Sequence, residues 1–162
     1  MTLAWPTDMP RCLDYPTVGI DAVLAGAARA YPDRIALQDG DLALTFAELH
    51  DQARRAAGGL RALGVQPGDV VALHMQNNLW YVVAYYGVLC AGAAVAPVNP
   101  TLPPAGLHDQ LDDVKARVVI SHPESVGIVL AADTQCVDEV VCVSTTPSAP
   151  ATETALPERV LA

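Results

Sequence analysis

The sequence predicts an α/β fold, a mostly parallel sheet flanked by helices, with a small β-hairpin ahead of it. Short apolar runs with the length of buried strands alternate with helical patterns from residue 68 onward. Each helical segment connects two such runs, as the right-handed crossovers of a parallel sheet require. Before residue 68, a glycine-containing turn and a well-capped amphipathic helix predict the remaining elements.

The chain begins with a segment that has no regular pattern. Residues 1–18 contain three prolines among mixed polar neighbours, so we expect an irregular N-terminal arm on the surface. Apolar residues at helical spacing follow, namely Ile20, Val23, Leu24, Ala27 and Ala28. They predict a first helix that ends near Tyr31, because Pro32 disfavours helical geometry in the residue before it.

A turn sequence predicts the hairpin. The apolar runs at 34–37 and 42–44 flank Asp39-Gly40. Glycine supplies the positive φ that a tight hairpin turn requires, so these two runs are expected to pair as antiparallel strands.

The next helix has the clearest start and end in the sequence. Thr45 and Glu48 have the spacing of a capping box, and an apolar stripe follows them. Gly64 stands where a left-handed residue commonly ends a helix. We therefore expect a helix from Thr45 to about Leu63.

The alternating part of the chain completes the predicted fold. Strands are expected at residues 70–75, 93–98, 117–121 and 139–143, and helices at 79–90, 104–114 and 124–131. With the elements before them they form an α/β subdomain at residues 19–144. Residues 145–162 are rich in Ser, Thr, Pro and Ala and predict a linker or exposed connection toward further chain.

Charge and cysteine content exclude several classes of protein. Nine Lys and Arg residues against eighteen Asp and Glu give a formal net charge of −9, which repels nucleic acid and anionic membranes. Four cysteines without a CxxC pair, and a start without the regions of a signal peptide, favour a cytoplasmic location. Apolar residues make up 52% of the chain, so some apolar surface is expected to pack against a partner.

Residues 79–98 raise the alternative of a membrane protein, since this stretch carries no charge and has the length of a span. Ala91-Gly92 interrupts it as a helix end would, and a short apolar run follows. A buried helix followed by a buried strand is therefore favoured over a membrane span.

The sequence lacks the motifs of nucleotide, metal and serine-nucleophile chemistry. Neither G-x-G-x-x-G nor G-x-x-x-x-G-K-[ST] occurs, and Ser121 lacks the glycines of a G-x-S-x-G elbow. The spacing of zinc ligands is not found among the histidines, which are His50, His74, His108 and His122. We expect no catalytic, cofactor-binding or metal-binding residue in this chain.

Other residues have both a structural and a functional interpretation. His74 lies on a predicted strand and could face a ligand, although a structural role is favoured. Gly58-Gly59 inside a helix favours close packing over ligand contact. The aromatic residues within 80–86 favour core packing, and the aspartates within 109–113 favour a solvated surface.

Four segments carry motifs in a recognisable order, namely Tyr31–Leu37, Leu44–Leu49, Gly64–Ala72 and Leu89–Pro100. Together they resemble a known family, the AMP-forming acyl-CoA synthetases with their relatives, nonribosomal peptide adenylation domains and luciferases. The second segment is similar to the family's L-T-Y-x-E-L motif, and the match runs through roughly residues 31–121. At 104–107 the chain lacks the Glu-Leu pair that the family often has. The family's phosphate loop ending in P-K-G, its ATP-site motifs, its hinge and its C-terminal lysine also have no counterpart.

The resemblance implies the first subdomain of the N-terminal domain of an ATP-dependent carboxylate ligase. Such a ligase, an acid-thiol ligase, activates a fatty or aryl acid as an acyl-adenylate and then forms an acyl-thioester. ATP, Mg²⁺ and CoA are implied for the complete enzyme, with none bound by this chain alone, which is expected to be inactive. Its expected partner is the remainder of the enzyme, in cis or as a second chain, or a second copy in a homodimer. The alternative is a stand-alone binding, regulatory or scaffolding module that pairs with a full-length ligase.

Overall fold

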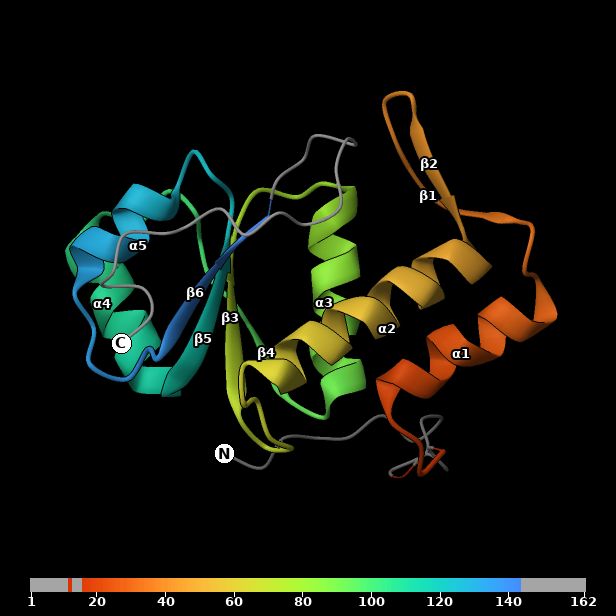
Figure 1. Ribbon diagram of the computed structural model, residues 1–162, viewed down its shortest axis with the longest axis horizontal. Coiled ribbons are helices and arrows are strands. Elements are labelled where there is room, and N and C mark those ends of the chain that lie inside the picture. Colours follow the sequence, from red (N-terminus) through yellow and green to blue (C-terminus); the bar gives the residue numbers. More distant parts are fainter. Residues whose placement is uncertain (1–11, 13–15, 144–162) are drawn as a thin grey trace, which may run out of the picture.

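The computed structural model describes Cys12 and residues 16–143 (Figure 1). Most of the expected arm at 1–18 and the expected linker at 145–162 lie outside the described residues. The boundaries predicted for these two segments therefore stay predictions.

The N-terminal elements are two helices and a hairpin. They are α1 (Ile20–Ala30), β1 (Ile35–Asp39), β2 (Leu42–Thr45) and α2 (Phe46–Ala62). The strands β1 and β2 pair antiparallel around Gly40, whose φ of 58° lies in the left-handed region. This confirms the hairpin that the sequence predicted.

The capping box at the start of α2 is also confirmed. The backbone N–H of Glu48 donates to Thr45 Oγ1 at 3.2 Å, and the backbone N–H of Thr45 donates to Glu48 Oε2 at 2.8 Å. The hydrogen bond from the Thr45 backbone N–H, together with one from the Thr45 hydroxyl, lowers the pKa of the Glu48 carboxyl. At the other end, Gly64 follows the helix with a φ of 85°. The local sequence thus fixes both ends of α2.

The remaining elements form the parallel sheet and its crossovers. They are β3 (Val70–His74), α3 (Leu79–Ala91), β4 (Ala94–Pro97), α4 (Pro104–Val114), β5 (Ala116–Ser121), α5 (Val126–Ala132) and β6 (Glu139–Cys142). The strand order is β4-β3-β5-β6, and every neighbouring pair is parallel. The mostly parallel sheet of the sequence prediction is therefore correct.

Helices cover both faces of the sheet, so the two central strands are buried (Figure 1). Helices α2 and α3 close one core against residues such as Val71 and Leu73. Helices α4 and α5 close a second core around Ala72 and Val119 on the other face. A third core lies between α1, α2, α3 and the hairpin. Burial on both faces explains why the middle of each of these strands is a continuous apolar run rather than an alternating pattern.

Helix α3 lies between two of these cores, and this position explains its composition. Val88 packs toward the sheet, whereas Leu79 and Val83 pack toward α1 and the hairpin. The charge-free stretch at 79–98 is thus a buried helix, a turn at Gly92 and strand β4. Among the described residues, no helix has the length and apolarity to cross a membrane.

Helices α3 and α2 are in close contact at Gly87. A Cβ placed on Gly87 would lie 2.7 Å from the Cβ of Ala56, which is too short for two carbon atoms. Close packing was predicted instead at Gly58-Gly59, and that prediction is wrong. Both of those glycines are exposed, and a Cβ on either would have no neighbour within 4 Å. Sequence alone shows only that helical glycines are present, not which faces a neighbour.

Arg117 ties together three segments at the amino edge of the sheet. Its Nη1 donates to Asp69 Oδ2 at 2.7 Å and its Nε to Asp138 Oδ2 at 2.7 Å. Nη1 also lies 3.4 Å from the carbonyl oxygen of Gly64. A hydrogen bond from the backbone N–H of Gln66, helped by Arg117, lowers the pKa of the Asp69 carboxyl. One guanidinium therefore connects the turns that lead into β3 and β6.

A buried polar pair lies at the opposite edge of the two central strands. His74 ends β3 and Ser121 ends β5, and both side chains are fully buried. His74 Nδ1 lies 3.4 Å from Ser121 Oγ, a long contact for a hydrogen bond. Burial lowers the pKa of the imidazole, so His74 is held in its neutral form. The structural role that the sequence favoured for His74 agrees with this burial.

Replacing Gly87 by alanine should destabilise the protein although alanine favours helix. The added methyl group would meet Ala56, and such overpacking costs about 1–3 kcal/mol. Gly58→Ala is a matched control on the exposed face of α2, where relief of the glycine penalty should raise stability by about 0.5–1 kcal/mol. Urea unfolding measures both changes. The double variant Gly87→Ala with Ala56→Gly should recover most of the loss, and no recovery would contradict the contact.

The stability should depend on pH through His74. Its pKa in the folded state lies below the ordinary 6.5. The unfolded chain therefore takes up a proton that the folded chain resists, and stability should fall as the pH decreases below about 6.5. In His74→Leu this decrease should be smaller, as measured by urea unfolding between about pH 7.5 and about pH 5.

Ser121→Ala is the control for this experiment, because burial rather than the serine lowers the imidazole pKa. It should keep the pH dependence of the parent chain. An equal pH dependence in the parent and in His74→Leu would show that another group is responsible.

Candidate functional site

The carboxyl edge of the sheet is where the order of the strands reverses. The chain passes from β3 to β4 in one direction, then returns past β3 to β5 and β6. The helix of the first crossover, α3, and those of the later ones, α4 and α5, cover opposite faces. In open α/β sheets, ligands bind outside the carboxyl ends of the strands near such a reversal.

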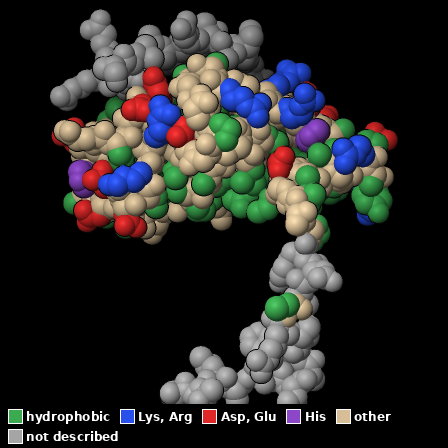
Figure 2. All heavy atoms as spheres, turned by 90° about the horizontal axis from the view of Figure 1, so that it is seen from below, with side chains coloured by type: hydrophobic (Ala, Val, Ile, Leu, Met, Phe, Trp, Pro, Cys, Tyr) green, Lys and Arg blue, Asp and Glu red, His purple; other side chains and the backbone are tan. Residues whose placement is uncertain are grey.

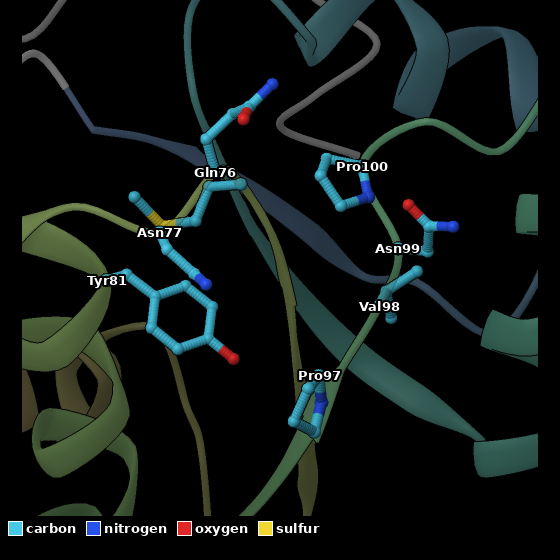
Figure 3. A pocket seen from close by; sticks show the side chains of 8 residues that line it. Gln76, Asn77, Tyr81, Pro97, Val98, Asn99 and Pro100 are labelled. Atoms are coloured by element: carbon cyan, nitrogen blue, oxygen red, sulfur yellow. The ribbon is translucent and has the colours of Figure 1, made fainter.

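A cleft of about 400 Å³ lies at this edge, beside the ends of β3 and β4. Figure 3 shows Asn77 and Tyr81 on one side of it and residues 97–100 on the other. Met75 and Gln76, which follow β3, complete the lining. The cleft therefore lies between the start of α3 and the segment that follows β4.

Capping interactions hold the α3 side of the cleft in place. The backbone N–H of Tyr81 donates to Asn78 Oδ1 at 2.9 Å. The backbone N–H of Leu79 donates to Asp39 Oδ2, in the hairpin, at 3.1 Å. Two of the free N–H groups at the helix start are thus satisfied by side chains, which fixes the first turn that presents Tyr81.

A turn around Asn99 fixes the opposite side. Asn99 Oδ1 accepts hydrogen bonds from the backbone N–H and the hydroxyl of Thr101, at 3.0 and 2.8 Å. The backbone N–H of Val98 donates to the carbonyl oxygen of Leu73 at 3.1 Å and so continues the pairing of β4 with β3. The two sides are therefore positioned by the sheet and by local turns.

The side chains that line the cleft are all neutral. They are amides, a phenol, a thioether, a valine and two prolines. Burial raises the pKa of the Tyr81 hydroxyl, and Tyr85 adds to this effect, so the phenol stays protonated. The cleft can offer shape, apolar contact and hydrogen bonds to a ligand. It offers no group suited to acid–base catalysis near neutral pH.

The residues that line the cleft are not suited to bind a nucleoside triphosphate or Mg²⁺. The lining has no cation to face phosphate oxygens and no carboxylate to bind a metal ion. Within the described part of the chain, no group of three or more His, Cys, Asp and Glu side chains could hold a metal ion. We therefore assign to these side chains no reaction step that involves a bound triphosphate or Mg²⁺.

The aromatic residues predicted to pack in the core do so only in part. Trp80, Tyr81 and Tyr85 are half-buried against the core at the sheet, and Tyr85 and Tyr86 meet edge to face at 5.8 Å. Tyr81 also lines the cleft, which the sequence analysis did not foresee. Periodicity cannot separate these roles, because a residue in the first turn of α3 faces the core and the edge of the sheet together.

Ser121 is placed as a structural residue. Its hydroxyl lies 3.4 Å from the carbonyl oxygen of His122 and 3.5 Å from Ser125 Oγ, in a fully buried position. A buried serine with only long polar contacts is not an accessible nucleophile.

The cleft itself was missed from sequence. Asn77 and Asn99 follow two successive parallel strands, and polar residues directly after buried strands are the signal that could have indicated a site there. The neighbouring Asn78 instead caps the start of α3 through its side chain.

Sequence relatives are carboxylate ligases and peptide synthetases. Over 117 residues, 34% are identical to the long-chain-fatty-acid–CoA ligase of Bacillus subtilis (strain 168), which covers 72% of this chain and 21% of that ligase. The D-lysergyl-peptide-synthetase subunit 1 of Epichloe festucae var. lolii is 35% identical over 118 residues, or 73% of this chain and 3% of that protein. The chain therefore spans about a fifth or less of the length of these relatives.

The solved structure of Mycobacterium tuberculosis fatty acyl CoA synthetase superposes with a TM-score of 0.73 at 30% identity. The match covers 77% of this chain and 26% of the synthetase. The family described as AMP-binding enzyme matches residues 24–160, which is most of the chain. The chain belongs to this family of AMP-binding enzymes and corresponds to an N-terminal portion of its adenylate-forming domain.

Proposed function

We propose that this chain supplies the first subdomain of an ATP-dependent ligase that activates a fatty or aryl carboxylic acid. The family match over residues 24–160 is the observation that carries this proposal. In the complete enzyme, the carboxylate displaces pyrophosphate from ATP to give an acyl-adenylate, and a thiol such as that of CoA then takes the acyl group and releases AMP.

The chain alone is proposed to be inactive. The neutral lining of its carboxyl-edge cleft supports this view, because stabilising charge on a phosphoryl group requires cationic or N–H donors and Mg²⁺. Those donors are assigned to the rest of the enzyme. The contribution of this chain is one wall of the catalytic domain, with Tyr81 and the turn at Asn99 held rigidly at its edge.

An uncovered apolar stripe supports pairing with further protein. Ile20 and Val23 on α1 and Tyr31 directly after it are 53–62% exposed, although Leu24, one turn from Ile20, is 3% exposed. The apolar side of α1 is thus only partly covered, which is typical of a surface that packs against further protein. The remainder of the ligase, in cis or as a second chain, is the proposed partner. A module that binds a full-length ligase is the alternative that the same stripe supports.

The proposed compartment is the cytosol. All four cysteines are free, and Cys90, Cys136 and Cys142 are half-buried. Burial raises the pKa of each of these three thiols, which favours the protonated, more slowly reacting form. Free thiols of this kind suit a reducing environment.

Exchange of labelled pyrophosphate into ATP tests the function. The purified 17.0 kDa chain, given ATP, Mg²⁺ and a panel of fatty and aryl acids, should show no exchange above background. A family ligase from which the matched N-terminal segment has been removed should also be inactive. Mixing the two, or joining them in one chain, should produce acid-dependent exchange.

Two outcomes would contradict parts of this proposal. Exchange by the isolated chain would contradict its inactivity. A chain that binds an intact ligase but never restores the truncated one would favour the regulatory or scaffolding module. A Cβ on Gly58 would touch no other residue, so Gly58→Ala leaves the α2–α3 contact unchanged. This variant should therefore restore exchange as well as the parent chain does.

A further inference from the structure

A second, strongly polar groove of about 500 Å³ lies between α1, α2 and α3. Helix α2 provides most of its lining, namely His50, Asp51, Arg54, Arg55, Ala57 and Arg61. Asp21 of α1 and Cys90 of α3 form the facing walls. The Arg61 end of the groove lies at the amino edge of the sheet, because α3 runs toward β4 and Cys90 is in its last turn.

The groove follows from the spacing of residues on α2. His50, Arg54, Ala57 and Arg61 recur at intervals of four, three and four residues and therefore share one face of the helix. Ala57 is buried and short, so the space between the two arginines is left open. In Figure 2, basic side chains, all of them arginines on this part of the molecule, gather near a histidine on the half formed by α1 and α2.

The three arginines differ in what already binds them. Arg55 pairs with Asp51 one turn away, at 2.8 Å between Nε and Oδ2, so their charges offset each other. Arg61 donates to the carbonyl oxygen of Cys90, in the last turn of α3, which holds its guanidinium in position. Arg54 has no ion pair within the described residues. Its guanidinium is therefore available to bind a ligand in the groove.

Arg54 and Arg61 both influence the pKa of the Cys90 thiol. Burial raises the pKa of the Cys90 thiol and Asp21 raises it further, whereas Arg61 and Arg54 oppose this shift. Both guanidiniums and the carboxylate thus lie within electrostatic reach of one neutral thiol. The positive charge converges beside α2, and the single carboxylate outside the Arg55 pair lies on the α1 side.

We propose that this groove binds the phosphate group of a small organic phosphate between Arg54 and Arg61. Planar guanidiniums match phosphate oxygens in geometry and charge. A chain with a net charge of −9 tends to repel anions, so binding an anion requires a local group of cations. Arg54 and Arg61 form such a pair, and Arg61 is already held in position. This proposal does not rest on the ligase function.

Nuclear magnetic resonance of the full chain with inorganic phosphate tests the proposal. Titration at constant ionic strength, with chloride replaced by phosphate, should shift the backbone amides of α2 and saturate. Arg54→Ala should weaken the binding about tenfold, the loss expected for one charge-assisted contact. Arg54 is exposed, so this variant keeps the fold. Arg34→Ala, outside the groove, is the matched control and should leave the affinity unchanged.

Alkylation of cysteines gives a second readout. Phosphate should slow the alkylation of Cys90, measured on the Cys90 peptide by mass spectrometry, and leave Cys142 unaffected. Shifts that never saturate, shifts equal to those from chloride, or an equal loss in Arg54→Ala and Arg34→Ala would overturn the site.

Discussion

The packing of α3 is the constraint on which the rest of the structure depends. This helix covers one face of the sheet and at the same time supports α2, α1 and the hairpin. Two cores therefore share one helix, which carries no charged residue. The carboxylate of Asp39 in the hairpin caps its first turn, and Arg61 of α2 binds a carbonyl in its last turn. The N-terminal elements are thus attached to both ends of α3 as well as to its side.

The same packing separates two polar regions of the molecule. The neutral cleft lies where α3 begins, at the carboxyl edge of the sheet, and the arginine groove lies where α3 ends. One region offers amides and a phenol, and the other offers guanidiniums around a thiol. The two regions therefore lie at opposite ends of one continuous helix.

Most of the fold could be predicted because its signals are local. Each signal lies within a few residues of chain: the capping box of Thr45 and Glu48, the turn at Asp39-Gly40, and the apolar runs of the parallel strands. The features that could not be predicted depend on residues far apart in the sequence. Arg117 contacts Asp69 and Asp138 only because β3, β5 and β6 lie side by side. The cleft likewise exists only once β3 and β4 are neighbours, so Asn77 and Asn99 indicate a site only when they are considered together.

The contact of Gly87 with Ala56 has a consequence for how related sequences diverge. No side chain can be added at position 87 while a methyl group lies opposite it at this distance. A larger residue at position 87 is compatible with the fold only if residue 56 becomes smaller or the two helices move apart, which would open both cores that α3 closes. The two positions should therefore vary together among homologues, and the volume of the pair should be more nearly constant than the identity of either residue.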